Sequence, residues 1–253
     1  MTALLLNRSD LSILNKRSLN YNLADAEKDY LLAVVSKVMY DSPLKEKLVF
    51  KGGTAIHHCC LPQTRFSEDL DFTSLDNAIT LDEVKTVLQS EDFLEVKKDY
   101  VSEATIKIER LKYTGPLGLP NSLKIEIDYK QSVILPTKVL EYKNAWKVKT
   151  KVRVMDPREI CAEKIRAASD RARYRDFYDL ILLFGKFAFD IKEIVALIKQ
   201  KEIRKPITQN SMFKNWKLAK KERGLELSSI YYANDLNDAD VNALIKKIKV
   251  NVA

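Results

Sequence analysis

The spacing of hydrophobic residues changes once along this chain, close to Asp156. Before that point, short segments alternate apolar and polar side chains, as strands with one buried face do, and helical patterns separate them. After it, apolar residues recur at the spacing that is typical of amphipathic helices. The pattern predicts an α+β fold, with a mixed-sheet domain over residues 1–155 and a helical domain over residues 156–253.

Individual elements follow from these patterns. Helices are expected in the first domain at Asp25–Tyr40, Ala55–Cys60 and Leu81–Gln89. Strands are expected there at Lys47–Phe50, Leu70–Ser74, Leu94–Lys112 (as one or two strands), Leu123–Tyr129 and Trp146–Val154. The second domain is expected to contain helices at Pro157–Ala168, Tyr174–Phe187, Ile191–Lys201, Ser211–Arg223 and Asp238–Val250.

Composition excludes some classes of protein. No apolar run approaches the roughly 20 residues that a membrane-spanning helix needs, and the N-terminus lacks the apolar centre of a secretory signal. We therefore expect a cytoplasmic protein without a membrane span. The adjacent Cys59 and Cys60 and the isolated Cys161 form neither a disulfide framework nor a metal pattern, so reduced thiols are expected. The histidine pair His57 and His58 has no metal-binding spacing, and we expect it to be structural.

Two carboxylates stand two positions apart at Asp69 and Asp71. Side chains at this spacing on a strand project to the same face, so both can bind the same metal ions. A third acid is available at Glu126 or Asp128, on the polar side of the expected strand Leu123–Tyr129. Two Mg²⁺ ions (Mn²⁺ is possible) held by such acids can neutralise a triphosphate and activate an attacking hydroxyl.

A glycine turn precedes these acids. Gly52, Gly53 and Thr54 open the expected helix, where bare backbone and free N–H groups can approach phosphate oxygens. Each piece also has an ordinary explanation, because Asp-x-Asp occurs in exposed loops and paired glycines are often plain turns. The prediction therefore depends on their combination and order.

Further blocks extend the pattern. They are Phe50–Ala55 (FKGGTA), Arg65–Phe72 (RFSEDLDF), Lys124–Ile127 (KIEI), and Ala162–Ala167 (AEKIRA) followed by Arg175–Leu180 (RDFYDL). Together they resemble the AbiEii/AbiGii family, the nucleotidyltransferase-like toxins of toxin–antitoxin and abortive-infection (phage-defence) pairs. The resemblance covers about Leu48 to Leu183 and implies a DNA-polymerase-β-like core with mixed sheet, followed by a helical C-terminal part.

The resemblance also implies roles for single residues. It assigns metal binding to Asp69 and Asp71, with Glu126 favoured over Asp128 as the third acid because it lies in the KIEI block. The residues that it places at the triphosphate are Ser67, Gly52, Gly53, Thr54 and Lys164. It assigns support of the site to Asp176 or Asp179. The stretch of 15 residues between Gly53 and Asp69 is slightly longer than is general for the superfamily.

Several charged residues have two interpretations. Lys164, Arg171, Arg175 and Asp179 fall approximately on one face if a single helix runs through them, and such a stripe is usually solvated. Arg175, like Arg173, can contact phosphate, or it can pair with Asp179. Arg65 can contact the nucleotide or form a salt bridge with Glu68.

The predicted activity is transfer of a nucleoside monophosphate from a nucleoside triphosphate (NTP) to a hydroxyl acceptor, with release of pyrophosphate. The resemblance implies RNA, at a tRNA 3′ end, as the acceptor, and a cognate antitoxin as a possible partner. A net charge of +8 and the expected cationic strand face of Lys147, Lys149, Lys151 and Arg153 favour RNA. The alternatives are a small-molecule nucleotidyltransferase of the aminoglycoside-modifying kind and a non-catalytic NTP-binding protein with the same fold.

Overall fold

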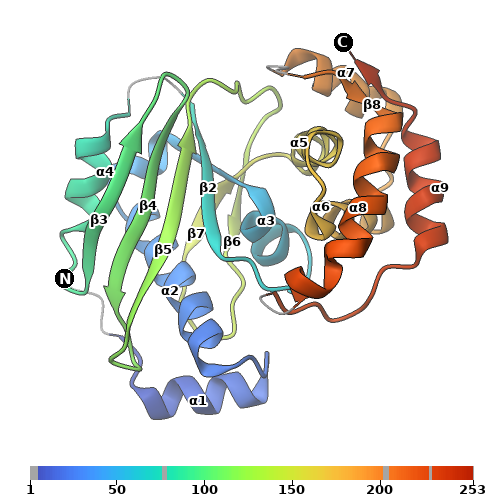
Figure 1. Ribbon diagram of the computed structural model, residues 1–253. Helices are drawn as coiled ribbons and strands as arrows, with labels where there is room; N and C mark the ends of the chain where they lie inside the picture. Colours follow the sequence, from blue (N-terminus) through green and yellow to red (C-terminus); the bar gives the residue numbers. More distant parts are fainter. Residues whose placement is uncertain (1–4, 76–78, 202–204, 228–229, 253) are drawn as a thin grey trace. The chain divides into compact units, whose positions relative to one another are not determined.

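The computed structural model describes residues 5–75, 79–201, 205–227 and 230–252. The chain forms two compact units (Figure 1). Unit 1 comprises Met1–Cys59, Phe66–Val133 and Thr137–Val154, and unit 2 comprises Cys60–Arg65, Ile134–Pro136 and Met155–Ala253. The predicted α+β class is confirmed, because a mixed sheet dominates unit 1 and helices dominate unit 2.

In its described residues, unit 1 is built on one sheet of seven strands. The strands are β1 (Leu48–Lys51), β2 (Asp69–Ser74), β3 (Leu94–Val101), β4 (Thr105–Thr114), β5 (Pro120–Asp128), β6 (Lys138–Glu141) and β7 (Lys151–Val154). Their spatial order is β3-β4-β5-β2-β1-β7-β6. β2 is parallel to β5 and β1 is parallel to β7, whereas the other neighbours are antiparallel.

The helical elements of unit 1 are short except for α2. They are α1 (Arg8–Arg17), α2 (Leu23–Tyr40), the 3₁₀ helix η1 (Pro43–Glu46), α3 (Gly52–Ala55), the π-helical turn η2 (Ile56–Cys60) and α4 (Leu81–Leu88). The side chain of Asn22 caps α2 by accepting from the Asp25 N–H. Thr80 and Glu83 form a capping box at the start of α4.

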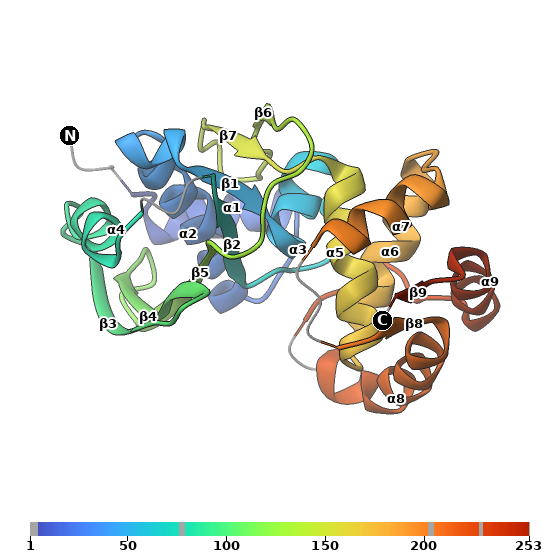
Figure 2. The same ribbon diagram turned by 90° about the horizontal axis from the view of Figure 1, so that it is seen from above.

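The core of unit 1 lies between the sheet and α2. Figure 2 shows α2 and α4 on one side of the sheet. The ring of Tyr40 on α2 lies 6.2 Å from that of Phe72 on β2, which lies 5.2 Å from Phe50 on β1. The alternation along β2 and β5 thus directs their apolar side chains toward the helices and leaves their polar side chains on the other face.

Unit 2 packs helices around α5 (Pro157–Asp170), which contacts three others. Those helices are α6 (Tyr174–Lys186), α7 (Ile191–Gln200) and α8 (Gln209–Leu227), and the unit is completed by α9 (Asp238–Ile248) and the strand pair β8 (Ile207–Thr208) and β9 (Asn251–Val252). Asp156 caps α5, and Pro157 occupies its first turn. Within residues 5–75, 79–201, 205–227 and 230–252, no helix combines the length and apolarity that crossing a bilayer requires.

Two of the expected elements differ from the structure. The expected strand Trp146–Val154 is wrong in its first half: Lys147 has a left-handed φ of +64°, and the Asn144 side chain accepts from the N–H groups of Trp146 and Val148. The predicted cationic strand face is therefore wrong as well, because its first two lysines lie outside the strand. The expected helix Ala55–Cys60 begins earlier, at Gly52, and continues as the π-helical turn. Neither α1 nor β6, β8 and β9 was predicted.

Candidate functional site

Strand register brings the predicted acids of unit 1 onto one face. In the parallel pair β2 and β5, Asp71 lies directly beside Glu126, and Asp69 lies beside Lys124. On the other side of β2, Lys51 pairs with Asp71. Directly paired residues of neighbouring strands project to the same face of a sheet. Asp69, Asp71 and Glu126 are all partly exposed there.

The glycine turn contacts the acid pair. Gly52 has a φ of +75°, and a Cβ added to it would lie 2.2 Å from Oδ2 of Asp71. Any other residue would therefore be strained in its backbone and would collide with this carboxylate. Two motifs that are separate in the sequence thus form one site, in which the backbone at the start of α3 lies against Asp71.

Thr54 stabilises this arrangement through a hydrogen bond. Its hydroxyl donates a hydrogen bond of 2.5 Å to the backbone carbonyl of Asp69, and the residue is buried. The bond holds α3 against β2. Ser67 is partly exposed and precedes Asp69 by two positions, so it lies at the entrance to β2.

The two candidates for the third acid differ in their surroundings. Glu126 pairs with Lys107 at 2.9 Å, and the side chains are 44% and 39% exposed. Exposed pairs of this kind contribute about 0 to 1 kcal/mol, so Glu126 can readily exchange its partner. Asp128, in contrast, accepts from the N–H groups of Lys130 and Gln131, and its Oδ2 lies 3.6 Å from the buried Lys51. The geometry favours Glu126.

The chemistry of this face fits a hard divalent cation. Its donors are carboxylate oxygens, which Mg²⁺ prefers. Among the described residues, no three His, Cys, Asp or Glu side chains are already grouped closely enough to hold an ion. Metal binding therefore requires at least that Glu126 turn away from Lys107. The partial exposure of both side chains permits that change.

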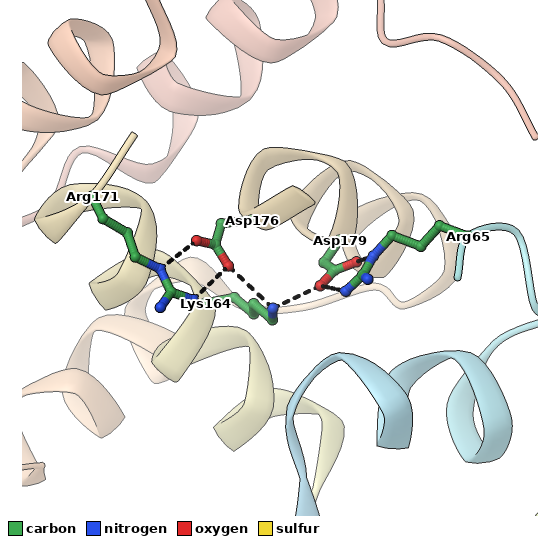
Figure 3. A network of polar contacts seen from close by, with 5 residues as sticks. All are labelled: Arg65, Lys164, Arg171, Asp176 and Asp179. Atoms are coloured by element: carbon green, nitrogen blue, oxygen red, sulfur yellow. Dashed lines mark hydrogen bonds and ion pairs between the residues drawn. The ribbon is translucent and has the colours of Figure 1, made fainter. Parts of the chain in front are cut away.

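The predicted residues of unit 2 form a buried ionic network, shown in Figure 3. Lys164 Nζ lies 2.7 Å from Asp179 Oδ2 and 3.2 Å from Asp176 Oδ1. Arg65 clamps Asp179 through two hydrogen bonds of 2.7 Å, from Nε and Nη2. Arg171 donates from Nε to Asp176 at 2.8 Å. Both carboxylates are fully buried, and Lys164 is only 8% exposed.

Opposite charges stabilise the ionised carboxylates in this network. Burial acts most strongly on Asp176 and opposes ionisation, but the charge of Lys164 and the hydrogen bond from Arg171 outweigh it and lower the pKa of Asp176. For Arg65, burial works against the charged form, and Asp179 overcomes it, so that the pKa of Arg65 is raised. Among the five residues drawn in Figure 3, three cations thus accompany two carboxylates.

Several alternatives for the charged residues are now resolved. The single-helix stripe through Lys164, Arg171 and Asp179 is wrong, because α5 ends at Asp170 and α6 begins at Tyr174. Lys164 is buried rather than solvated. The proposed pair of Arg65 with Glu68 is wrong too, since Arg65 binds Asp179, whereas Glu68 binds Lys28 at 3.0 Å.

Some residues of these clusters were missed by the sequence interpretation. Lys51 was considered only as part of the FKGGTA block, and Arg171 was not recognised as a partner of Asp176. The three cysteines form no disulfide among the described residues, and burial raises the pKa of the Cys161 thiol. Asp29 binds Trp146 Nε1 at 2.8 Å and lies 3.5 Å from His58 Nε2, which makes His58 part of the core.

Two solved structures of nucleotidyltransferases have a similar fold. MenT4, a nucleotidyltransferase toxin from Mycobacterium tuberculosis, is similar with a TM-score of 0.60 and 18% identity, over 95% of this chain and 99% of that one. A candidate nucleotidyltransferase from H. pylori is similar with a TM-score of 0.58 and 18% identity, over 90% of this chain and 96% of that one. At this identity the likeness concerns the fold alone.

The sequence itself defines the family. The model of the nucleotidyl transferase AbiEii toxins of type IV toxin–antitoxin systems matches residues 35–247. The chain therefore belongs to this family of nucleotidyltransferase toxins, as the sequence blocks predicted. No curated protein matches it.

Proposed function

We propose that this nucleotidyltransferase transfers a nucleoside monophosphate from an NTP to a hydroxyl of RNA, at the 3′ end of tRNA, and releases pyrophosphate. The observation that carries the proposal is the contact of three motifs on one sheet face: Asp71 lies beside Glu126 and against Gly52, with Asp69 two positions away on the same side. The biological role that follows is that of a toxin controlled by a cognate antitoxin.

Asp69, Asp71 and Glu126 would hold the divalent metal ions, as Mg²⁺ or Mn²⁺. When bound, these ions neutralise triphosphate charge and favour the ionised form of the attacking hydroxyl. Asp128 is not assigned to this set, because its carboxylate already caps Lys130 and Gln131 and faces Lys51.

Backbone and side-chain groups beside the acids would bind the nucleotide. Gly52 is partly exposed and its backbone lies against Asp71, so it would face the nucleotide beside the acids, whereas the buried Gly53 would support the turn from within. Ser67 contributes a hydroxyl at the entrance to β2. Thr54 acts indirectly, since its hydroxyl holds the start of α3 against Asp69.

We assign the neutralisation of triphosphate charge in unit 2 to Lys164. The support is the gathering of Lys164, Arg65 and Arg171 around two carboxylates, together with the burial that restricts the Lys164 side chain to one region. Asp176 and Asp179 then hold the ammonium group in place, and Arg65 and Arg171 orient the two carboxylates from their far sides.

The decisive experiment incubates the purified protein with each α-labelled NTP, Mg²⁺ and total tRNA, and follows label in the RNA. We expect labelled tRNA, lost on addition of EDTA and absent with Asp69→Asn. Label that enters a small aminoglycoside-type acceptor but no RNA would replace the proposed acceptor with the small-molecule alternative. NTP binding without any transfer would show a non-catalytic protein.

A further inference from the structure

One row of paired residues crosses five strands of unit 1, on the face that carries the acids. The register pairs Lys51 with Asp71, Asp71 with Glu126, Glu126 with Lys107, and Lys107 with Tyr100. All these residues project to the same face, because each pair is directly opposed. The acids therefore continue, strand by strand, into a lysine and then an aromatic ring.

The aromatic end of this row is open. Tyr100 lies on the edge strand β3 and is 54% exposed. Its strand neighbour Lys107 faces Glu126 in a weak exposed pair. Figure 2 shows α2 and α4 on one side of β3, β4 and β5. The apolar side chains of these strands face the helices, so the row that contains Tyr100 lies on the other face of the sheet.

A β-bulge brings further charged side chains beside the same acids. Between the pairs Ile108–Ile125 and Leu111–Leu123, the two residues Glu109 and Arg110 oppose the single residue Lys124. In the register of β2 and β5, Lys124 lies directly beside Asp69. Both Arg110 and Lys124 are exposed, and neither forms an ion pair within the part of the chain that the structure describes. The negative charge at this bulge, Glu109, pairs with Lys98, so Arg110 and Lys124 can still attract an anionic ligand.

We propose that this β3–β5 face, formed by Tyr100, Lys107, Arg110 and Lys124, binds the single-stranded end of the RNA acceptor. A base stacks on Tyr100, while Arg110 and Lys124 contact backbone phosphates. An aromatic platform flanked by cations is the surface that binds single strands with little sequence preference. The inference rests on the proposed function and adds to it the place where the acceptor lies.

The dimensions of a sheet agree with this assignment. Neighbouring strands are about 4.8 Å apart, so Tyr100, three strands from Asp71, lies roughly 14 Å from it across the sheet. A base stacked there and a hydroxyl at the acids are too far apart to belong to one nucleotide. The face thus suits a polymer, whereas a small acceptor at the acids would not reach Tyr100. Lys107 becomes free for a phosphate when Glu126 turns away from it.

The test measures binding without NTP or metal, so that it does not depend on transfer. The probe is a short single-stranded oligoadenylate, labelled at its 5′ end and with a free 3′ hydroxyl, followed by fluorescence anisotropy over a range of salt. Tyr100→Ala should weaken binding about tenfold through the loss of one stacked base, and Tyr100→Phe should bind like the wild type. R110A/K124A should reduce the magnitude of the slope of log K against log salt by about 1.4, or about 0.7 for each phosphate contact.

A matched control removes the same charge elsewhere. K16A/R17A changes two exposed cations on α1, a helix that packs against α2, and should leave the salt slope unchanged. Wild-type affinity in both Tyr100→Ala and R110A/K124A would overturn the proposed face, and so would an equal loss in K16A/R17A. If the wild type transfers label to tRNA but these variants bind RNA normally, the assigned face alone fails. If the wild type binds no RNA, both the face and the RNA acceptor fail.

Discussion

The two charged clusters of this protein differ in how they treat their carboxylates. On the sheet face of unit 1, Asp69, Asp71 and Glu126 are partly exposed, and the ion pair of Glu126 with Lys107 is weak. In unit 2, Asp176 and Asp179 are fully buried and bound by cations at 2.7 to 3.2 Å. The first arrangement leaves the acids partly exposed to solvent, as the proposed metal site needs, whereas the second uses them to hold cations. Replacing a carboxylate should therefore reduce mainly activity in unit 1 and mainly stability in unit 2.

The largest expected effect on activity is that of Asp71→Asn. The change removes a metal-binding charge but keeps the size of the side chain, so transfer should fall at least about a thousandfold. Because Asp71 is only partly buried, the free energy of unfolding should change by about 1 kcal/mol or less. Label transfer and urea unfolding measure the two quantities. An active Asp71→Asn enzyme would refute the metal assignment.

The third acid gives the next largest difference. Glu126→Gln should reduce transfer about a hundredfold, because the paired position beside Asp71 loses its charge. Asp128→Asn should reduce it less than about tenfold, since that side chain is occupied by Lys130, Gln131 and Lys51. Transfer rates over a Mg²⁺ titration compare the two variants. The reverse order would assign the third ligand to Asp128.

Asp179→Ala tests the opposite expectation in unit 2. Without this carboxylate, the buried guanidinium of Arg65 loses its clamp, and stability should fall by about 3 to 5 kcal/mol. Replacing both partners, as Arg65→Met with Asp179→Leu, should cost less, because Arg65 leaves no unpaired charge and Lys164 still has Asp176 as a partner. Urea unfolding of both single variants and the double variant measures the coupling. If Asp179→Ala lowers the free energy of unfolding by less than about 1 kcal/mol, the buried carboxylates of unit 2 do not serve mainly to hold cations.

Lys164 separates a ligand role from a structural one within the buried network. Lys164→Ala should weaken NTP binding and slow single-turnover transfer, each by about tenfold, because triphosphate charge is no longer neutralised. Lys164→Arg need not restore either quantity, since a planar fork places its charge differently. Arg171→Ala is the matched control, because it also removes a cation from Asp176. If both variants bind NTP like the wild type, the role of Lys164 is confined to the network.

The sequence predicted which residues share one face of a strand, but it did not predict which residues of different strands or helices are in contact. Alternation along Leu123–Tyr129 placed Glu126 on a polar face, and the spacing of Asp69 and Asp71 placed both on one side. Their adjacency to Glu126 depends on the register of two parallel strands, which local patterns do not contain. The contact of Arg65 with Asp179 joins residues 114 positions apart, and no periodicity connects them.

Local structure was mispredicted where tertiary contacts override the pattern. Around Trp146, apolar and basic residues alternate as in a strand, but the ring is buried against α2 and donates to Asp29. The turn that allows this needs a left-handed Lys147, which carries no glycine signal. α1 was missed because Leu11 is its only apolar residue that is buried, so its apolar pattern is weak.

The smallest expected effect concerns Lys51, a buried cation on the acid face that pairs with Asp71 in register and lies 3.6 Å from Asp128. Its positive charge opposes the binding of a divalent cation at the neighbouring acids. Lys51→Met removes that charge and keeps most of the side-chain volume, so Mn²⁺ should bind the nucleotide-free protein about three- to tenfold more tightly. Asp128→Asn leaves Lys51 less compensated and should weaken Mn²⁺ binding by a similar factor. Isothermal titration with Mn²⁺ measures both, with Lys16→Met on α1 as a charge-matched control that should show no change. If Lys51→Met binds Mn²⁺ more weakly than the wild type, Lys51 positions the acids rather than competing with the metal. The acids of unit 1 would then depend on a neighbouring cation, as Asp176 and Asp179 do in unit 2.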